Sequence, residues 1–272
     1  GCNQFCSYCI IPYARGRVRS RRWEDIYAEI QGLAENGYQE IVLTGIHISS
    51  YGIDFDDEAW TMGKSAVRAR ETGQRDYQGS TKLIDLLERI QDVEGISRIR
   101  LGSLEPRIVT EENAKRLAAI PKICPHFHLS LQSGCDATLK RMNRHYTAGE
   151  YLECVERLRA VYDNPAVTTD VIVGFPGETE EEFEETISLI EEGTLVAAVA
   201  TQDALFEKTL SNMVEVKARG ASVLAVTNEG NTDIEKAADY VIYIPKTNPY
   251  FTNSLAIIPL QLFGYYVSVG KG

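Results

Sequence analysis

The chain has 272 residues, 44% of them apolar, which is enough to bury a substantial core and excludes disorder of the chain as a whole. The formal net charge of -11 argues against a generally basic nucleic-acid-binding protein, although a local basic patch stays compatible with it. No signal peptide is visible, and no apolar stretch reaches the roughly 18 residues that indicate a membrane span. We therefore expect a cytoplasmic protein without a membrane partner, whose six cysteines are reduced, bound to metal or buried.

Three of the six cysteines lie at the start of the chain, in GCNQFCSYC. Cys2, Cys6 and Cys9 form C-x-x-x-C-x-x-C, and thiolates this close can hold one metal centre if the backbone folds into a tight loop. A structural zinc site needs four ligands. A 4Fe-4S cluster held by three thiolates would leave one iron open to another ligand. Zinc and simple burial are the alternatives at this point.

A basic stretch follows these cysteines directly. Residues 15 to 22, RGRVRSRR, contain five arginines and no acidic residue. Guanidinium groups are suited to phosphate contacts, so an RNA backbone is one candidate partner. Ion pairs with the Glu-rich helices later in the chain are the alternative. The candidate RNA-binding residues are Arg15, Arg17, Arg19 and Arg21, with Arg22 beside them.

Short β-branched runs then alternate with amphipathic helical windows, which is typical of βα units around a parallel sheet. Two helices begin with a capping box, Thr147 with Glu150 and Thr179 with Glu182, in which a hydroxyl and a carboxylate satisfy free backbone N–H groups. Residues 54 to 80 show no sustained period and are predicted to be an insertion. The predicted strands are residues 41–48, 98–104, 126–131, 168–174, 195–200, 222–227 and 240–244.

One predicted strand alternates strictly between polar and apolar residues. In HFHLSLQSG, residues 126 to 134, a period of two puts the polar side chains on one face and the apolar ones on the other. Such a strand fits either a partial barrel whose interior meets a ligand or a sheet with one solvated face. The polar face would carry His126, His128, Ser130 and Gln132, and the apolar face Phe127, Leu129 and Leu131.

Two segments lie just past predicted strands. GFPGE, residues 174 to 178, precedes a helix, and its glycines allow the backbone to approach a ligand at the carboxyl ends of the strands. Glu105 and Arg107 follow another strand and either contact a cofactor or substrate or pair with each other. Residues 254–269 are predicted to form a buried helix. The cysteines without ligand spacing are predicted to be core residues: Cys124, Cys135 and Cys154.

These motifs resemble a known family. C-x-x-x-C-x-x-C with an aromatic residue before its last cysteine, here Tyr8, resembles the signature of radical S-adenosylmethionine enzymes. Residues 1–192 further resemble the tRNA methylthiotransferases in GCNQFCSYCIIPYARGRVRSR, IVLTGIHISSYG, RIRLGSLEP, HFHLSLQSGCDATLKRMNRHYT and TTDVIVGFPGETEEEF. Among those enzymes, the most similar is the one that adds a methylthio group to C2 of N6-threonylcarbamoyladenosine in tRNA, next to the anticodon.

The resemblance implies cofactors, partners and site residues. A 4Fe-4S cluster would be held by Cys2, Cys6 and Cys9, with S-adenosylmethionine on the open iron. The partners would be tRNA and an electron donor of the flavodoxin or ferredoxin type, and the oligomeric state stays open. Residues near the S-adenosylmethionine would be Tyr8, Gln132, Gly174, Gly177 and Glu178.

Residues 193–272 resemble a different family, the C-terminal sugar isomerase (SIS) region of glutamine:fructose-6-phosphate aminotransferase, in GTLVAAVATQ, VLAVTNEGN and IIPLQLFGYYV. The expected fold is α/β: a partial radical-SAM βα barrel without its first strand over residues 1–192, then a partial SIS-like parallel α/β unit. We expect a truncated and fused chain with exposed apolar surface, marginal stability and at most cofactor binding or unproductive cleavage. The alternative function is a sugar-phosphate-binding module built on the SIS-like part.

Overall fold

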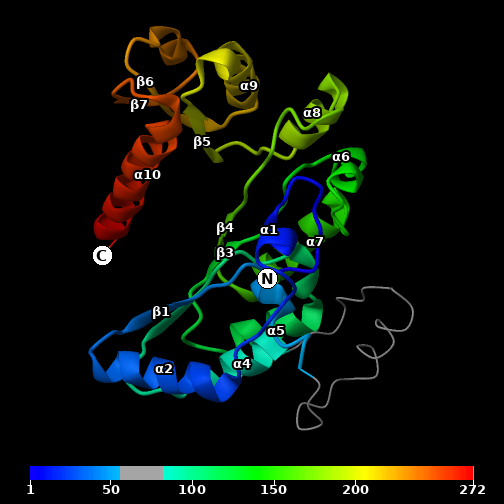
Figure 1. The fold of residues 1–272 in the computed structure, drawn as a ribbon, viewed down its shortest axis with the longest axis vertical. Coiled ribbons are helices and arrows are strands. Elements are labelled where there is room, and N and C mark those ends of the chain that lie inside the picture. Colours follow the sequence, from blue (N-terminus) through cyan, green and yellow to red (C-terminus); the bar gives the residue numbers. More distant parts are fainter. Residues whose placement is uncertain (56–81, 272) are drawn as a thin grey trace. The chain divides into compact units, whose positions relative to one another are not determined.

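The computed structural model describes residues 1–55 and 82–271, so most of the predicted insertion, residues 54–80, lies outside the described residues. The chain divides into two compact units, Gly1–Phe183 and Glu184–Gly272 (Figure 1). The boundary that the sequence indicates, between residues 192 and 193, stays a prediction. Within the described ranges, no helix is both long enough and apolar enough to cross a bilayer.

The first unit alternates helices and strands, as the sequence predicts. Neighbouring helices along the chain also pack on one another, α2 on α4, α4 on α5 and α5 on α7. In chain order the elements are α1 (Ile11–Ala14), α2 (Trp23–Glu35), β1 (Glu40–Leu43), η1 (Ile48–Ser50), α4 (Lys82–Ile90), β2 (Arg98–Leu101), η2 (Pro106–Ile108), α5 (Glu111–Ala118), β3 (His126–His128), α6 (Asp136–Arg141), α7 (Ala148–Val161) and β4 (Ala166–Thr168), followed by α8 (Glu180–Ile187), which crosses the unit boundary.

The strands of this unit are all parallel. Strand β1 pairs with β2, with Ile41 opposite Ile99, and β3 pairs with β4. Isolated parallel bridges join Ile99 to Ile123 and Leu104 to Leu129, so the segments lie in the order β1, β2, β3, β4. Parallel neighbours need crossover connections, which the helices supply here. The predicted α/β class with parallel sheets is confirmed.

The core of the first unit forms where the apolar strand faces meet the helices. Phe127 and Leu129 are fully buried while His126 and His128 are half-buried, which confirms the predicted alternation. Helix α7 begins with the predicted capping box and buries Leu158 completely. The second predicted box also forms at the start of α8, by reciprocal bonds between Thr179 and Glu182. Cys124, Cys135 and Cys154 are buried, as predicted.

Four predicted strands are shorter than expected. Those predicted at 98–104 and 126–131 end at Leu101 and His128. Residues 168–174 were predicted to be extended, but regular pairing covers only Ala166–Thr168, and Val171 forms an isolated bridge with Gln132. Gln132 has a φ of 70°, which interrupts the extended backbone that a ladder requires. The strand predicted at 41–48 ends at Leu43, and the chain turns into η1 five residues later.

The second unit is built around three parallel strands in the order β5, β6, β7. The central strand β6 buries both of its faces, including Val223, Ala225 and Val226, as a strand covered on two sides does. In chain order the elements are β5 (Leu195–Ala200), η3 (Asp203–Leu205), α9 (Phe206–Ala218), β6 (Ser222–Asn228), η4 (Thr232–Lys236), β7 (Tyr240–Ile244) and α10 (Pro249–Lys271).

Helix α10 corrects one prediction. Residues 254–269 are helical as expected, but they are not buried: Tyr265 is 62% and Tyr266 is 66% exposed. A helix of 23 residues is about 34 Å long, whereas strands of at most seven residues reach about 23 Å. Only its first turns therefore pack on the sheet, where Ala256 meets Val226 and Ile244. The rest gives the exposed apolar surface that the sequence predicts.

Candidate functional site

The cysteine loop at the start of the chain rests on the segment that follows α6. Ser7 donates its backbone N–H to the Met142 carbonyl at 3.0 Å and its hydroxyl to the Arg141 carbonyl at 2.8 Å. The Asn143 amide donates to the carbonyls of Gln4 and Phe5, at 3.0 and 2.8 Å. Phe5 and Asn143 both have positive φ, at 54° and 57°, a conformation that non-glycine residues adopt only when their surroundings hold them there.

The three thiols of this loop differ in burial. Cys2 is buried, and Cys6 and Cys9 are half-buried. Burial raises the pKa of the Cys2 thiol, and the nearby charges of the Cys6 and Cys9 thiolates raise it further. The Gln4 backbone N–H donates to Cys2 Sγ at 3.4 Å, and Arg144 Nη1 donates to Cys6 Sγ at 3.3 Å. The loop thus gathers three thiols whose charges interact, with donors beside two of them.

This donor set fits an iron–sulfur cluster. Among residues 1–55 and 82–271, no three His, Cys, Asp or Glu side chains close on a single metal ion. Soft thiolates are the ligands that iron–sulfur clusters select. The three thiols therefore have the donor chemistry of such a cluster.

The glycine-containing loop predicted to lie near the cofactor contacts the cysteine loop. The Tyr8 and Phe175 rings meet edge to face with centroids 6.2 Å apart. Gly174 and Gly177 have φ of 71° and 83°, which explains glycine at both positions. Glu178 Oε2 accepts from the backbone N–H of Gly174 at 2.5 Å and of Phe175 at 3.2 Å, so this carboxylate holds its own loop closed. Partial burial raises the pKa of Tyr8 to about 12.

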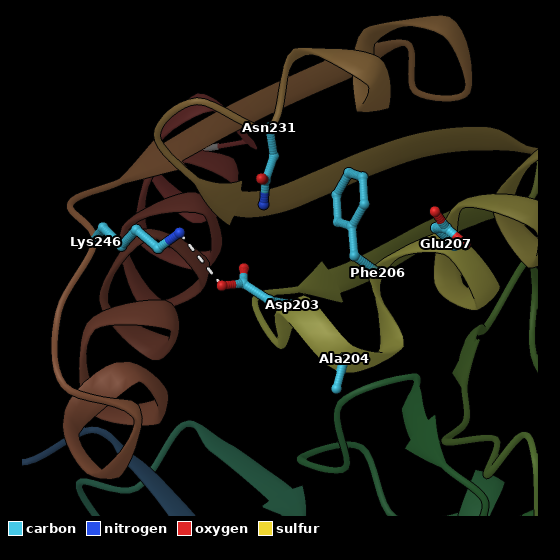
Figure 2. A pocket seen from close by; sticks show the side chains of 6 residues that line it. All are labelled: Asp203, Ala204, Phe206, Glu207, Asn231 and Lys246. Carbon is cyan, nitrogen blue, oxygen red and sulfur yellow. Dashed lines mark ion pairs between the residues drawn. The ribbon is translucent and has the colours of Figure 1, made fainter.

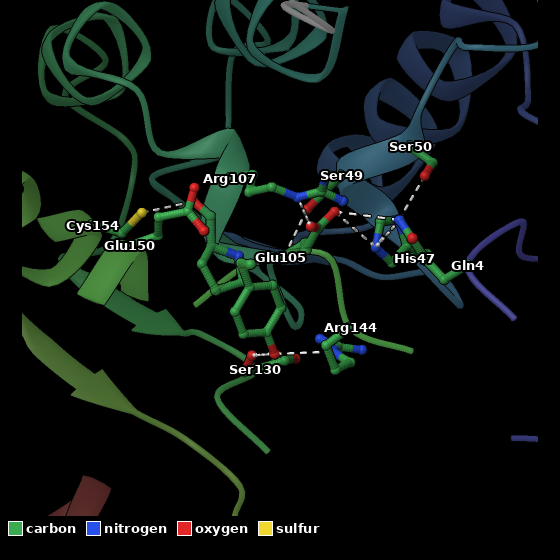
Figure 3. A network of polar contacts seen from close by, with 12 residues as sticks. Gln4, His47, Ser49, Ser50, Glu105, Arg107, Ser130, Arg144, Glu150 and Cys154 are labelled. Atoms are coloured by element: carbon green, nitrogen blue, oxygen red, sulfur yellow. Dashed lines mark hydrogen bonds and ion pairs between the residues drawn. The ribbon is translucent and has the colours of Figure 1, made fainter. Parts of the chain in front are cut away.

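Arg144 links the cysteine loop to strand β3. Its Nε donates to the Tyr146 hydroxyl at 2.9 Å, and this hydroxyl lies within hydrogen-bond distance of the Ser130 and Leu131 carbonyls (Figure 3). The next residue is Gln132, which has a φ of 70°. Its backbone N–H donates to the Asp170 carbonyl, and its carbonyl accepts from the Ile172 N–H, so backbone bonds hold this conformation. The predicted residue Gln132 thus stands at a fixed, strained position four residues past the end of β3.

The site residues that sequence reasoning missed are in this connecting segment. Asn143, Arg144 and Tyr146 all fall within the motif RMNRHYT, which carries the family resemblance but received no role. One sequence signal could have indicated them. The motif has neither a helical nor a strand period, and it places an Asn, a residue that tolerates positive φ, next to an arginine.

Glu105 is the most buried charged group near this loop, with 4% of its surface exposed. Arg107 pairs with Oε1, His47 Nε2 lies 3.5 Å from Oε2, and Gln4 Nε2 donates to Oε2 at 3.3 Å (Figure 3). Burial acts to raise the pKa of the carboxyl, but the bond from His47 and the charge of Arg107 outweigh it, so this pKa lies below its usual value. Of the two roles that the sequence leaves open, pairing with Arg107 is the one observed.

Polar side chains line one face of the middle strands. Burial lowers the pKa of His126, and the nearby charges of Arg100 and His128 lower it further. His128 lies 3.4 Å from Asp170 and 3.0 Å from the Thr168 hydroxyl. Arg100, His126 and His128 are half-buried, whereas Thr168 and Asp170 are exposed.

The predicted RNA-contacting residues are all on the surface: Arg15, Arg17, Arg19 and Arg21. Arg17 covers the Phe5 ring at 4.3 Å, and Arg21 pairs with Glu29 of α2, with about half of each side chain exposed. Across the described residues, Arg15 and Arg19 form no ion pair. The ion pair of Arg21 with Glu29 is thus an exposed one, not an interior one.

A separate pocket lies in the second unit, at the carboxyl ends of its strands (Figure 2). Its volume is about 360 Å³. Lys246, which follows β7, lies 3.3 Å from Asp203, which follows β5. The carboxyl ends of parallel strands are the usual position of ligand sites in open α/β sheets. The other lining residues are Ala204, Phe206, Glu207 and Asn231.

Parallel strands, with a loop of three cysteines beside the segments that follow β1 and β2, define an α/β protein with a thiol-lined candidate site. The sequence profile of the radical SAM superfamily matches residues 1–190, and the chain belongs to this superfamily. The cofactors of this superfamily are a 4Fe-4S cluster and S-adenosylmethionine. The profile of the SIS domain matches residues 169–269.

Curated relatives are similar over most of the chain. A tRNA-2-methylthio-N(6)-dimethylallyladenosine synthase from Thermoanaerobacter sp. (strain X514) is 39% identical over 234 residues, which cover 80% of this chain and 45% of the relative. The threonylcarbamoyladenosine tRNA methylthiotransferase MtaB from Chlamydia pneumoniae is 43% identical over 192 residues, 71% of this chain and 40% of the relative. The chain thus spans less than half the length of these relatives.

One solved structure, the apo form of the cobalamin-dependent S-adenosylmethionine radical enzyme OxsB, aligns with a TM-score of 0.45 at 12% identity. The alignment covers 90% of this chain and 31% of that chain.

Proposed function

We propose that the chain is the radical SAM core of a tRNA methylthiotransferase that adds a methylthio group to C2 of N6-threonylcarbamoyladenosine next to the anticodon. Cys2, Cys6 and Cys9 would hold the cluster. The chemistry supplied by a bound cluster would be reductive cleavage of S-adenosylmethionine, for which the protein would position the reactants. The support is the superfamily membership together with the three clustered thiols.

The chain's own residues would orient S-adenosylmethionine. Tyr8 meets Phe175 edge to face in the loop of Gly174, Gly177 and Glu178. The backbone of this loop can approach a ligand closely because no side chains project from its glycines. Gln132 lies four residues past the end of β3, and its backbone is held by bonds from its N–H and to its carbonyl. An amide donates and accepts, so it suits both the amino and carboxylate ends of the methionine moiety.

The observation that carries the choice of substrate is the polar strand face. Arg100, His126 and His128 supply half-buried polar groups, which suit a threonylcarbamoyl group with its carboxylate and hydroxyl. A dimethylallyl group would need an apolar pocket instead, and a site built to form hydrogen bonds rejects a ligand that lacks the matching groups.

The proposal includes two macromolecular partners. The exposed arginines Arg15, Arg17, Arg19 and Arg21 would contact tRNA phosphates beside the cysteine loop. A flavodoxin or ferredoxin type of protein would supply the electron. A cytoplasmic location goes with this proposal, because tRNA is the substrate.

The test uses two tRNAs that differ only in the modified adenosine beside the anticodon, one carrying threonylcarbamoyl and the other dimethylallyl. The anaerobically reconstituted protein is incubated with each tRNA, S-adenosylmethionine, sulfide and a reductant, and the nucleosides are analysed by mass spectrometry. Release of 5'-deoxyadenosine is expected to increase with the first tRNA only, without added methylthio mass, because cleavage by this chain is predicted to be unproductive. An increase with the second tRNA alone would contradict the proposed substrate, and failure to release any 5'-deoxyadenosine would overturn the radical function.

A second candidate function rests on the pocket of the second unit and the SIS profile match. We infer that Lys246 and Asn231 would suit the phosphate and hydroxyl groups of a sugar phosphate. Calorimetric titration with glucosamine 6-phosphate tests this function. Binding that a Lys246→Ala variant loses is expected, and absence of binding by the unaltered chain would refute it.

A further inference from the structure

Glu105 occupies a position where stability alone does not require a carboxylate. It follows β2 and is almost fully buried, beside Arg107 and His47. Removing charges from water is costly, and buried ion pairs can often be replaced by apolar residues of similar volume without loss of stability. A buried carboxylate with several fixed partners is therefore a candidate for a positioning role.

The two oxygens of this carboxylate have different partners. Oε1 pairs with Arg107, and Oε2 faces both His47 and Gln4 (Figure 3). The Glu105 backbone N–H donates to the Ser49 hydroxyl at 2.9 Å, and His47 Nδ1 lies 2.6 Å from the Ser50 hydroxyl. The segments after β1 and β2 thus hold Oε2 in place, and this oxygen accepts from a residue of the cysteine loop.

Gln4 connects this carboxylate to the first thiol. Its side chain donates to Glu105, its backbone N–H donates to Cys2 Sγ at 3.4 Å, and its carbonyl accepts from Asn143 at 3.0 Å. Phe5, the next residue, has a φ of 54°. Because Asn143 holds the backbone of Gln4 and Glu105 holds its side chain, Gln4 has little freedom to rotate. These two contacts therefore fix the position of its backbone N–H relative to Cys2 Sγ.

We propose that Glu105 is a positioning residue of the cysteine loop, which fixes Gln4 and thereby keeps Cys2 Sγ buried and hydrogen-bonded before any cluster is bound. The residue acts through Gln4 and touches neither the cluster nor the substrate. A role of this positioning in cluster binding rests on the proposed function, in which Cys2 is a cluster ligand. The positioning itself is a property of the metal-free chain.

The experiment measures the alkylation rate of each cysteine in the metal-free, reduced protein, by iodoacetamide pulses and peptide mass spectrometry. Gln4→Met keeps the length of the side chain and removes its donor, and Glu105→Gln removes the charge. Either variant should raise the rate at Cys2 about tenfold, the change expected when one hydrogen bond to a charged group is lost. Cys154, buried in the core, reports general unfolding in the same sample.

A matched control is Arg116→Gln, which breaks an ion-pair network with Asp85 and Glu88 between α4 and α5. It should leave the rate at Cys2 unchanged. The double variant of Gln4 and Glu105 should match the single variants, because both act through one contact. Gln4→Met leaves the ion pair of Glu105 with Arg107 intact, so the alkylation rate at Cys2 can be measured in this variant even if Glu105→Gln does not fold.

Three results would overturn the inference: an unchanged rate at Cys2 in Gln4→Met, rates at Cys2 and Cys154 that rise together, or a double variant whose effect multiplies those of the single variants. A chain that takes up no iron, yet shows the predicted response at Cys2, would refute the proposed function and leave the positioning role standing.

Discussion

Replacing Glu105 by glutamine should destabilise the first unit in a pH-dependent way. The carboxylate is 4% exposed and faces Arg107 and His47, whose side chains are 16% and 13% exposed. Removing one partner of a buried ion pair typically costs about 3–5 kcal/mol. Glutamine fills the same volume and keeps one acceptor oxygen, so we expect the lower end, about 3 kcal/mol at pH 7. That is a large share of the roughly 5–15 kcal/mol of a folded domain.

The sign of the pH dependence follows from the lowered pKa of Glu105. Its value lies below the ordinary 4.5 because the bond from His47 and the charge of Arg107 outweigh the opposing effect of burial. A carboxyl with a lowered pKa in the folded state stabilises fully above its unfolded pKa, and this stabilisation is lost as the pH falls through the folded pKa. The difference between the unaltered chain and Glu105→Gln should therefore be constant above about pH 5.5 and shrink below 4.5.

Urea unfolding followed by tryptophan fluorescence measures this difference. The chain has two tryptophans, and one of them, Trp23, lies on α2 in the first unit. Glu111→Gln serves as a matched control, because Glu111 forms an exposed pair with Lys115 and should change little. A loss below about 1 kcal/mol at pH 7, or a loss that does not change between pH 7 and 3, would refute the reasoning.

Three further variants probe other parts of the account. Asn143→Ala removes the donor to two carbonyls of the cysteine loop, at a residue with positive φ. It should lower the free energy of unfolding by about 2 kcal/mol and lower the amount of iron retained after desalting, and an unchanged amount of iron would contradict this. Leu158→Ala opens a cavity in the core and should cost about 3 kcal/mol in urea unfolding, and less than about 1 kcal/mol would contradict the packing. Arg15→Gln with Arg19→Gln should reduce the salt slope of tRNA binding by about 1.5; an unchanged slope excludes phosphate contacts.

Features that arise from neighbouring residues could be predicted from the sequence. The alternation in HFHLSLQSG predicts Phe127 and Leu129 inside and His128 on the other face, and the structure agrees. The capping box of Thr147 and Glu150 needs only a separation of three residues, and it forms. The parallel pairing follows from alternating strands and helices.

The parts of the site that depend on distant residues could not be predicted. Gln4 and Glu105 are separated by 101 positions, and Gln4 and Asn143 by 139, so no local period indicates that they meet. The exposure of α10 was also missed, because whether a helix is buried depends on the size of the sheet beneath it. Its apolar composition alone is equally compatible with a buried helix.

The account depends most directly on Cys2, Cys6 and Cys9 holding one iron–sulfur cluster. Anaerobic reconstitution with iron and sulfide, followed by metal and sulfide analysis with electron paramagnetic resonance of the reduced protein, measures this. We predict about four irons and four sulfides per chain, lost in Cys6→Ala and retained in Cys124→Ala, whose sulfur lies in the core. One zinc per chain, or iron that Cys6→Ala retains, would contradict the account.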